Sequence, residues 1–154
     1  MTAVRVETTV DAPPAQVWRH LADIADHVTW MADAAAIRFR GDRRSGVGTA
    51  FECETRLGPL RTVDVMEVTE WREGEAMAVR HTGLFTGTGR FLLRPAGPGR
   101  SHLSWHEDLR FPWWLGGVVG ASVARPVLRA VWRGNLRRFA ARVTAPAAGV
   151  DHRP

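Results

Sequence analysis

Three polar side chains of this 154-residue chain fall where strand-like alternation calls for apolar ones. His81 continues the alternation that begins at Met77, and Thr55 lies inside a similar pattern. Glu107 follows Trp105 in the same inward phase. A buried histidine beside a carboxylate can act first as general base and then as general acid, because the carboxylate fixes the imidazole tautomer. We therefore predict that His81 and Glu107 form a catalytic pair.

Each of these residues also has a simpler interpretation. A single inward histidine is commonly a core residue whose hydrogen bonds are satisfied. Glu107 could instead pair with an arginine of the C-terminal helix. Thr55 could be no more than a small residue that favours strands. These alternatives stay open at the level of the sequence.

The composition excludes several other chemistries. All 21 basic residues are arginine, and Lys and Tyr are absent, so neither a lysine Schiff base nor a phenolic acid is available. Cys53 is the single cysteine, which excludes an internal disulfide and a zinc site built on cysteines. His102 and His106 lie on a strand about 13 Å apart, too far to share a metal. We expect no metal and no cofactor.

The charge and the hydropathy bound the partners and the compartment. The net charge of +5 comes from arginines interleaved with 16 acidic residues, and no nucleic-acid-binding motif accompanies them, so we expect no nucleic-acid partner. No apolar run approaches the ~18 residues of a membrane span, and the first residues do not form a signal peptide. We therefore expect a cytoplasmic protein.

Periodicity predicts one strand at about residues 4–10 and six more between Ala35 and Phe111. Gly- and Pro-containing turns separate these six segments. In one of them Val63 and Val65 carry the apolar phase, and the phase then changes. We expect a β-bulge near Met66 as the reason.

Three helices complete the pattern. A proline-started helix follows Asp11, with Val17, Trp18 and Leu21 on its apolar side, and Asp23 is the expected N-cap of a second, short helix reaching about Met31.

The third helix is long and is expected from about Gly117 to Val143. A single long helix after antiparallel strands must bury its apolar stripe against the sheet, and a curved sheet then encloses a pocket. The predicted apolar stripe is Val127, Leu128, Val131, Trp132, Leu136, Phe139 and Val143, and Arg125, Arg129, Arg133 and Arg137 recur on the other side.

This order of elements resembles the helix-grip fold of the START/Bet v 1-like (SRPBCC) superfamily, in particular its polyketide cyclase/dehydrase branch. The segments that carry the resemblance are residues 6–18, 23–30 and 124–139. The resemblance implies an α+β fold, in which a curved antiparallel sheet of about seven strands wraps around the long C-terminal helix and encloses a hydrophobic cavity. It also implies a single domain, residues 1–144, followed by a flexible tail, residues 145–154.

The resemblance further implies that a hydrophobic or aromatic small molecule occupies the cavity of a monomer or homodimer. In the cyclase branch the reaction is an aldol-type cyclisation with dehydration of a polyketide-like intermediate, without a cofactor. His81 and Glu107 would then remove an α-proton and later protonate a leaving hydroxyl. The side chains expected to contact the ligand are Trp30, Phe51, Thr55, Met77, Phe91, Trp105, Leu128 and Trp132.

Two other functions stay open. One is a noncatalytic carrier of a lipid, a quinone or another hydrophobic metabolite. The other is a module that contacts a membrane surface or a protein through the aromatic segment 111–115 and the arginine stripe. The simpler interpretation of that segment is that its tryptophans pack against the protein and that the arginines are solvated. We therefore rank membrane contact last.

Overall fold

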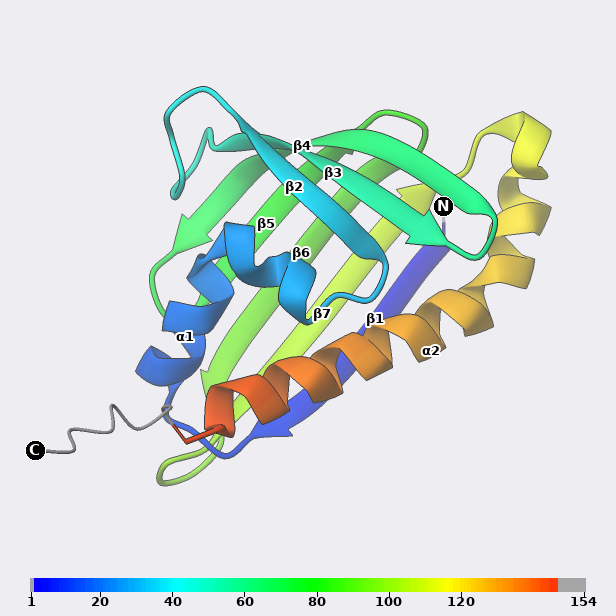
Figure 1. Cartoon of the computed structure of the whole chain (residues 1–154). Helices are drawn as coiled ribbons and strands as arrows, with labels where there is room; N and C mark the ends of the chain where they lie inside the picture. The colour runs from blue at the N-terminus through cyan, green and yellow to red at the C-terminus, as the bar shows by residue number, and fades with distance from the viewer. Residues whose placement is uncertain (1, 147–154) are drawn as a thin grey trace, which may run out of the picture.

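Seven antiparallel strands form one curved sheet in the computed structural model of the chain, which describes residues 2–146 (Figure 1). The strands are β1 (Thr2–Val10), β2 (Ala34–Arg40), β3 (Ala50–Leu57), β4 (Leu60–Arg72), β5 (Ala76–Thr82), β6 (Thr86–Pro95) and β7 (Ser101–Arg110). Strands β2 to β7 follow one another as hairpins, and β1 pairs with β7, so the order across the sheet is β1-β7-β6-β5-β4-β3-β2. The strands lie where the alternation predicts them.

The helices cover the concave side of the sheet. They are α1 (Pro14–Ala22), the 3-10 helix η1 (Ile24–Thr29), the short 3-10 turn η2 (Trp113–Leu115) and α2 (Gly117–Thr144). Figure 1 shows α2 running across the open side of the sheet while α1 and η1 close its other end. The predicted α+β helix-grip fold is confirmed. None of the helices within residues 2–146 has the length and apolarity needed to cross a membrane.

The short helices begin much as the sequence predicts. Pro14 stands in the first turn of α1, and Val17, Trp18 and Leu21 are its buried residues. Asp23 holds the position before η1, but its side chain makes no capping hydrogen bond, and η1 is a 3-10 helix that ends at Thr29. The tail predicted to be flexible lies, apart from residues 145 and 146, outside the described residues, and the assignment of residues 1–144 to one domain stays a prediction.

The apolar stripe of α2 is buried against the sheet from Leu128 onward. The buried residues of its C-terminal part are Leu128, Trp132, Asn135, Leu136, Phe139 and Val143. The stripe of four arginines faces solvent, as predicted. The expectation that Val127 belongs to the buried stripe is wrong, because its side chain is 53% exposed. It lies about 100° around the helix axis from Leu128, on the side turned away from the sheet.

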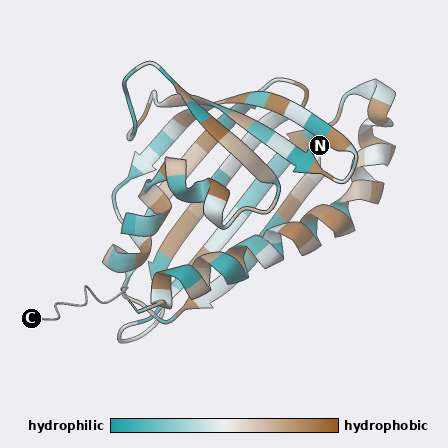
Figure 2. Cartoon of the chain, viewed as in Figure 1, coloured by the Kyte–Doolittle hydropathy of each residue, from teal (hydrophilic) through white to brown (hydrophobic). Residues whose placement is uncertain are grey.

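The phase of β4 differs from the prediction. Val63 is exposed, whereas Asp64 is buried in register with the inward-facing Val68. The bulge lies between Val68 and Glu70, beyond the expected position at Met66. Because Thr62 and Asp64 are the inward residues here, apolar alternation indicated the wrong face. Figure 2 shows the mixture of hydrophobic and hydrophilic residues along these strands.

Candidate functional site

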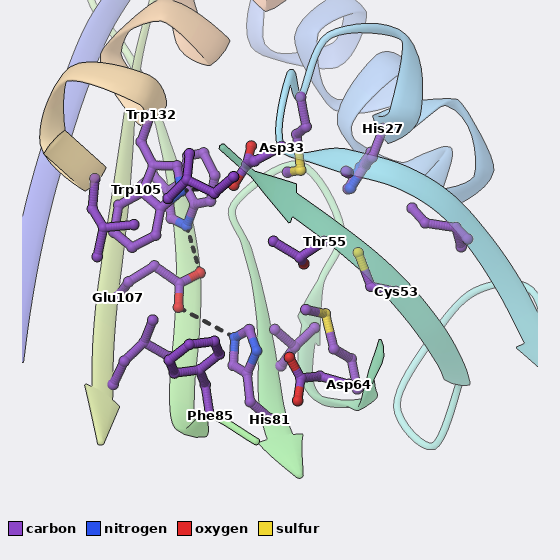
Figure 3. Close-up of a pocket in the computed structure, with 18 of the residues that line it drawn as sticks. His27, Asp33, Cys53, Thr55, Asp64, His81, Phe85, Trp105, Glu107 and Trp132 are labelled. Carbon is purple, nitrogen blue, oxygen red and sulfur yellow. Dashed lines mark hydrogen bonds and ion pairs between the residues drawn. The ribbon is translucent and has the colours of Figure 1, made fainter. Parts of the chain in front are cut away.

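A cavity of about 190 Å³ lies between the concave face of the sheet and α2. Its wall is mostly apolar, and its polar members are His27, Asp33, Thr55, Asp64, His81 and Glu107 (Figure 3). The volume is below the roughly 300–1,000 Å³ of typical ligand pockets, so it suits a small ligand. The predicted ligand contacts that line it are Phe51, Thr55, Met77, Phe91, Trp105, Leu128 and Trp132.

Trp30 is the predicted ligand contact that does not line this cavity. It is 1% exposed at the end of η1, and its ring centroid lies 4.9 Å from that of Phe139. The indole also meets the edges of Phe91 and Trp105 from behind the cavity wall. Trp30 therefore supports the lining residues from behind, and its contact with a ligand stays a prediction.

The predicted catalytic pair is assembled at one side of the cavity. His81 Nε2 of β5 lies 3.2 Å from Glu107 Oε2 of β7, and both side chains are almost fully buried. Trp105 Nε1 donates a hydrogen bond of 2.7 Å to the other carboxylate oxygen, Oε1. The carboxylate is thus held from one side by the indole and faces the imidazole with the other, as the dashed lines in Figure 3 show.

Two glycines of β6 allow this contact between strands that are not neighbours. Strands β5 and β7 flank β6, and two inter-strand spacings amount to roughly 10 Å. Gly87 pairs with His81, and Gly89 pairs with Glu107, so β6 places no side chain between them. A Cβ on Gly89 would lie 2.3 Å from Glu107 Oε1. The glycine leaves the space that the Glu107 side chain needs to cross β6.

The two facing atoms of the pair are not fully satisfied. His81 Nε2 and Glu107 Oε2 are buried, and neither has a well-aligned hydrogen-bond partner within residues 2–146. Their 3.2 Å contact is therefore an ion pair with poor hydrogen-bond alignment. Buried polar atoms left in this state commonly serve a ligand or a reaction.

Charge and burial act in opposite directions on His81. Burial lowers the pKa of His81, but the close contact with Glu107 and its charge, together with the charge of Asp64, outweigh burial and raise the pKa above its ordinary value. The imidazolium form is therefore stabilised beside the carboxylate.

Asp64 is a member of the site that the sequence did not reveal. It is 4% exposed and lines the cavity from β4. Its Oδ1 accepts a hydrogen bond of 2.7 Å from the Leu84 amide, and its Oδ2 accepts one of 3.1 Å from the Thr62 hydroxyl. A Cβ on Gly83 would lie 2.1 Å from Oδ1, so a glycine again leaves space for a carboxylate.

His27 is a second lining residue that the sequence did not assign to the site. Its Nε2 donates a 2.7 Å hydrogen bond to the Leu21 carbonyl, which fixes the tautomer of the neutral ring. The ring also packs against Trp30, with centroids 5.0 Å apart. Burial lowers the pKa of His27 and outweighs the Leu21 hydrogen bond and the charges of Asp23 and Asp26. His27 is therefore held neutral.

Asp33 anchors α2 at the rim of the cavity. Its carboxylate accepts hydrogen bonds from Asn135 Nδ2, at 2.7 Å, and from Trp132 Nε1, at 3.2 Å. Asn135 Oδ1 in turn accepts the Ala32 amide at 2.9 Å. This network holds the Trp132 ring against the cavity, where its centroid lies 5.2 Å from that of Trp105.

Thr55 and Cys53 lie on β3 in the cavity wall, as their alternation predicts. Burial raises the pKa of the Cys53 thiol to about 11, and a hydrogen bond with Thr55 offsets part of this rise. The thiol is therefore not a nucleophile near neutral pH. Within the part of the chain that the structure describes, no three His, Cys, Asp or Glu side chains are placed to hold a metal ion.

A family model described as polyketide cyclase / dehydrase and lipid transport matches residues 1–144. No curated protein is detectably similar in sequence.

Several solved structures share the fold at low sequence identity. The protein TTHA0849 from Thermus thermophilus is 19% identical with a TM-score of 0.74, and the match covers 92% of this chain and 96% of that one. The Zhui aromatase/cyclase from a Streptomyces species is 18% identical with a TM-score of 0.70, covering 96% and 98%. CV1439 from Chromobacterium violaceum is 17% identical with a TM-score of 0.72, covering 95% and 100%. These similarities concern the fold alone.

Proposed function

Because the chain belongs to the polyketide cyclase/dehydrase and lipid transport family, we propose that its cavity binds a hydrophobic or aromatic small molecule and that His81 and Glu107 catalyse an aldol-type cyclisation of it. The observation that carries the proposal is the His81–Glu107 ion pair in an otherwise apolar cavity. The similarity in fold to an aromatase/cyclase is consistent with this chemistry.

Stability alone gives little reason for this pair. A buried ion pair costs more in desolvation than it returns unless its geometry is very good, and apolar replacements are often as stable. Here the alignment is poor and both facing atoms lack further partners among the described residues. The pair also requires a glycine at position 89 of β6, because any side chain there would meet the Glu107 carboxylate. A role in proton transfer accounts for these features together.

The proposed reaction uses one proton site twice. Neutral His81 removes a proton from a substrate carbon between two carbonyl groups, and the C–H electrons become an enolate. The enolate carbon attacks a second carbonyl of the same molecule, which forms the carbon–carbon bond and an alkoxide. The His81 imidazolium, stabilised beside Glu107, returns the proton to that oxygen. His81 then takes a further α-proton, whose C–H electrons form the carbon–carbon double bond, and gives that proton to the departing hydroxyl, which leaves as water.

The surrounding wall would position a flat substrate. Trp105 stacks obliquely on Phe91 and Trp132, with ring centroids 5.0 and 5.2 Å apart. Aromatic walls of this kind favour ring-shaped or conjugated ligands, because offset and edge contacts add to the apolar burial. We propose that Trp105 fixes Glu107 and contacts the substrate with its ring.

Single-turnover assays with a short poly-β-ketone thioester would test the proposal. We expect Glu107→Gln and His81→Ala to slow product formation roughly 10²- to 10⁴-fold, while quenching of Trp fluorescence by the same thioester changes little. Glu52→Gln makes the same carboxylate-to-amide change on a half-buried side chain of β3 that does not line the cavity, and it should leave the rate unchanged. Product formation at the wild-type rate in both cavity variants would refute the catalytic roles.

The apolar wall also favours a second function, that of a carrier of a lipid, a quinone or another hydrophobic metabolite. A carrier would bind its ligand tightly and release it unchanged. Native mass spectrometry of the purified protein would detect a copurified ligand. Tight binding of the thioester without any product would favour the carrier over the cyclase.

A further inference from the structure

An exposed apolar surface lies at the start of α2 and in the turn η2 before it. Six side chains, each 53% to 86% exposed, form what we term the outer α2 surface: Trp113, Trp114, Val118, Val119, Val123 and Val127. The expectation that these tryptophans pack against the protein is wrong. Figure 1 shows this first part of α2 reaching past the ends of the strands, and Figure 2 shows that hydrophobic residues occur along it.

The helix is apolar on two opposite sides. Val119, Val123 and Val127 recur every fourth residue and form one stripe along the axis. Val123 and Trp132 are nine residues apart and therefore about 180° apart around the axis. Trp132 faces the cavity, so the valine stripe faces outward. A helix that is apolar on both sides is expected to have a partner on each, and nothing within residues 2–146 covers the outer one.

The positive charge of the chain is concentrated in the same segment. Residues 110–144 contain seven of the 21 arginines and no acidic residue. The acidic residues of the chain therefore all lie outside this segment, where they offset the remaining arginines. Around the helix axis Arg129, Arg133 and Arg137 lie within about 120° of Val123, whereas Arg125 lies about 160° away. None of these four arginines makes an ion pair with a described residue.

On the outer face of the sheet, by contrast, arginines form ion pairs with glutamates. Arg40 lies 2.7 Å from Glu52, Arg80 lies 3.0 Å from Glu67, and Arg90 lies 2.7 Å from Glu70. The only pairing that an arginine of α2 makes with a carboxylate among the described residues is that of Arg142 with Asp26, at the far end of the helix. The lack of ion pairs is therefore specific to the arginine stripe of α2 and is not shared by every arginine in the chain.

We propose that the outer α2 surface docks on an anionic lipid bilayer. The valines and the two tryptophans would enter the boundary between headgroups and acyl chains, and the flanking arginines would meet the lipid phosphates. A second copy of the chain is a poor occupant, because two such surfaces would bring arginines together without a carboxylate. A bilayer offers an apolar layer to the valines and tryptophans and negatively charged phosphates to the arginines.

Docking would place one end of the cavity at the lipid. Ala124 and Leu128 belong to the same turns of α2 and line the cavity on the inner side. Phe111, which precedes η2, and Phe85, between β5 and β6, also line the cavity, with ring centroids 4.9 Å apart. An apolar ligand could pass between bilayer and cavity over a short path. The docking itself does not depend on the catalytic function proposed above.

Vesicle co-sedimentation of the full chain tests the proposal. We expect binding to vesicles of equal parts phosphatidylcholine and phosphatidylglycerol, weaker binding to pure phosphatidylcholine, and release by salt. The fluorescence of Trp113 and Trp114 should shift to shorter wavelength on binding. Trp113→Ala with Trp114→Ala should abolish that shift and reduce the partition coefficient at least about tenfold.

Matched pairs of arginines separate a specific surface from net charge. Arg129→Gln with Arg133→Gln should reduce partition into the mixed vesicles about 25-fold, at about fivefold for each charge near the lipid surface. Arg40→Gln with Arg80→Gln removes the same charge from the outer face of the sheet and should reduce partition less than about threefold.

Exposed valines give a second pair. Val123→Ser should weaken binding to the mixed vesicles, whereas Val47→Ser, at a similarly exposed valine before β3, should not. Both variants should melt at the wild-type temperature, because neither side chain is buried.

Four results would overturn the proposal. They are no binding to phosphatidylglycerol-containing vesicles, equal losses in the two arginine pairs, a dimer that Val123→Ser dissociates, and binding to an acidic polyglutamate peptide in the absence of vesicle binding. The third would assign the surface to a second copy of the chain, and the fourth to an acidic protein.

Discussion

His81 and His27 line the same cavity and are buried to nearly the same extent, with 9% and 6% of their surfaces exposed. Their pKa values nevertheless move in opposite directions. Burial lowers the pKa of His27, because its main partner is the neutral carbonyl of Leu21. Burial also acts on His81, but Glu107 and, more weakly, Asp64 outweigh it and raise the pKa.

The partner of a buried histidine, more than its burial, therefore decides what it can do. His27 keeps one proton on Nε2 and packs on Trp30, which suits a fixed part of the η1 wall. His81 lies beside a carboxylate that stabilises its charged form, and its Nε2 lacks an aligned hydrogen-bond partner among the described residues. Only His81 combines a proton that can be exchanged with a position open to a ligand.

We expect the largest effect from adding one methyl group to β6. A Cβ on Gly89 would lie 2.3 Å from Glu107 Oε1, so Gly89→Ala should displace the carboxylate from both His81 and Trp105. We expect turnover to fall 10²-fold or more and the free energy of unfolding to fall by about 1–3 kcal/mol. Assays of the thioester reaction and urea unfolding would measure the two losses.

Gly134→Ala is the matched control for that substitution. Its Cβ would meet Arg138 Nη1 at 3.6 Å, an ordinary contact, inside α2. Because alanine favours a helix, this change should stabilise the protein by up to about 1 kcal/mol. If Gly89→Ala behaved like Gly134→Ala, the dependence of the His81–Glu107 contact on a glycine in β6 would be disproved.

The pH dependence of stability distinguishes the two histidines, because their pKa values shift to opposite sides of the ordinary histidine pKa of about 6.5. The folded pKa of His27 is lowered, so the unfolded chain binds its proton first, and stability should fall as the pH drops below about 6.5. The folded pKa of His81 is raised, so its contribution is complete below about 6.5 and is lost as the pH rises through the folded value.

His27→Gln should therefore flatten the acid side of the profile, with each proton worth about 1.4 kcal/mol per pH unit. His81→Gln should flatten the alkaline side. His106 on the outer face also has a lowered pKa, chiefly through burial, so part of the acid slope should remain. Chemical unfolding at several pH values would give these slopes, and a His27→Gln profile that superimposes on the wild-type profile would contradict the assignment.

The smallest effect is expected at Cys53, where alkylation reports on the cavity wall without any substitution. Its pKa is raised to about 11 by burial, as expected for a group without a cationic partner. At pH 8 the thiolate should be about 100-fold scarcer than at the ordinary pKa of 9.0. Alkylation by iodoacetamide should therefore be at least that much slower in the folded protein than in urea. Rapid labelling of the folded chain would show that the wall opens to water.

The contact between His81 and Glu107 could be predicted from the sequence, because each residue interrupts an apolar alternation. His81 and Glu107 each occupy an inward position of a regular strand, and the structure brings them together as predicted. The succession of strands along the chain and the long helix follow from the same local periodicities. For these features the information lies within a few neighbouring residues.

The remaining members of the site depend on contacts between distant segments. Asp64 is buried because the Leu84 amide and the side-chain-free Gly83 receive its carboxylate. His27 is buried by packing between η1 and β6, where its ring meets Phe91. No local pattern marks either residue, and apolar neighbours even indicated the wrong face for Asp64.

Trp30 and Val127 lie elsewhere than their local patterns suggested, for the same reason. Trp30, predicted to contact the ligand, packs behind the cavity wall on Phe139, a residue more than 100 positions away in the chain. Val127, expected in the core, lies where α2 turns away from the sheet. Periodicity predicts which residues share a face of a helix, but it does not say where a tertiary partner ends.

An NMR titration of the imidazole signals of His27 and His81, in the wild type and in Glu107→Gln, would show directly whether Glu107 makes His81 a proton-transfer group. His27→Gln and His81→Gln variants would assign the two signals. We predict a wild-type midpoint above about 6.5 for His81 and below it for His27, and a fall of the His81 midpoint toward that of His27 in Glu107→Gln. A wild-type His81 midpoint below about 6.5, or one that Glu107→Gln leaves unchanged, would contradict the claim that Glu107 makes His81 a proton-transfer group.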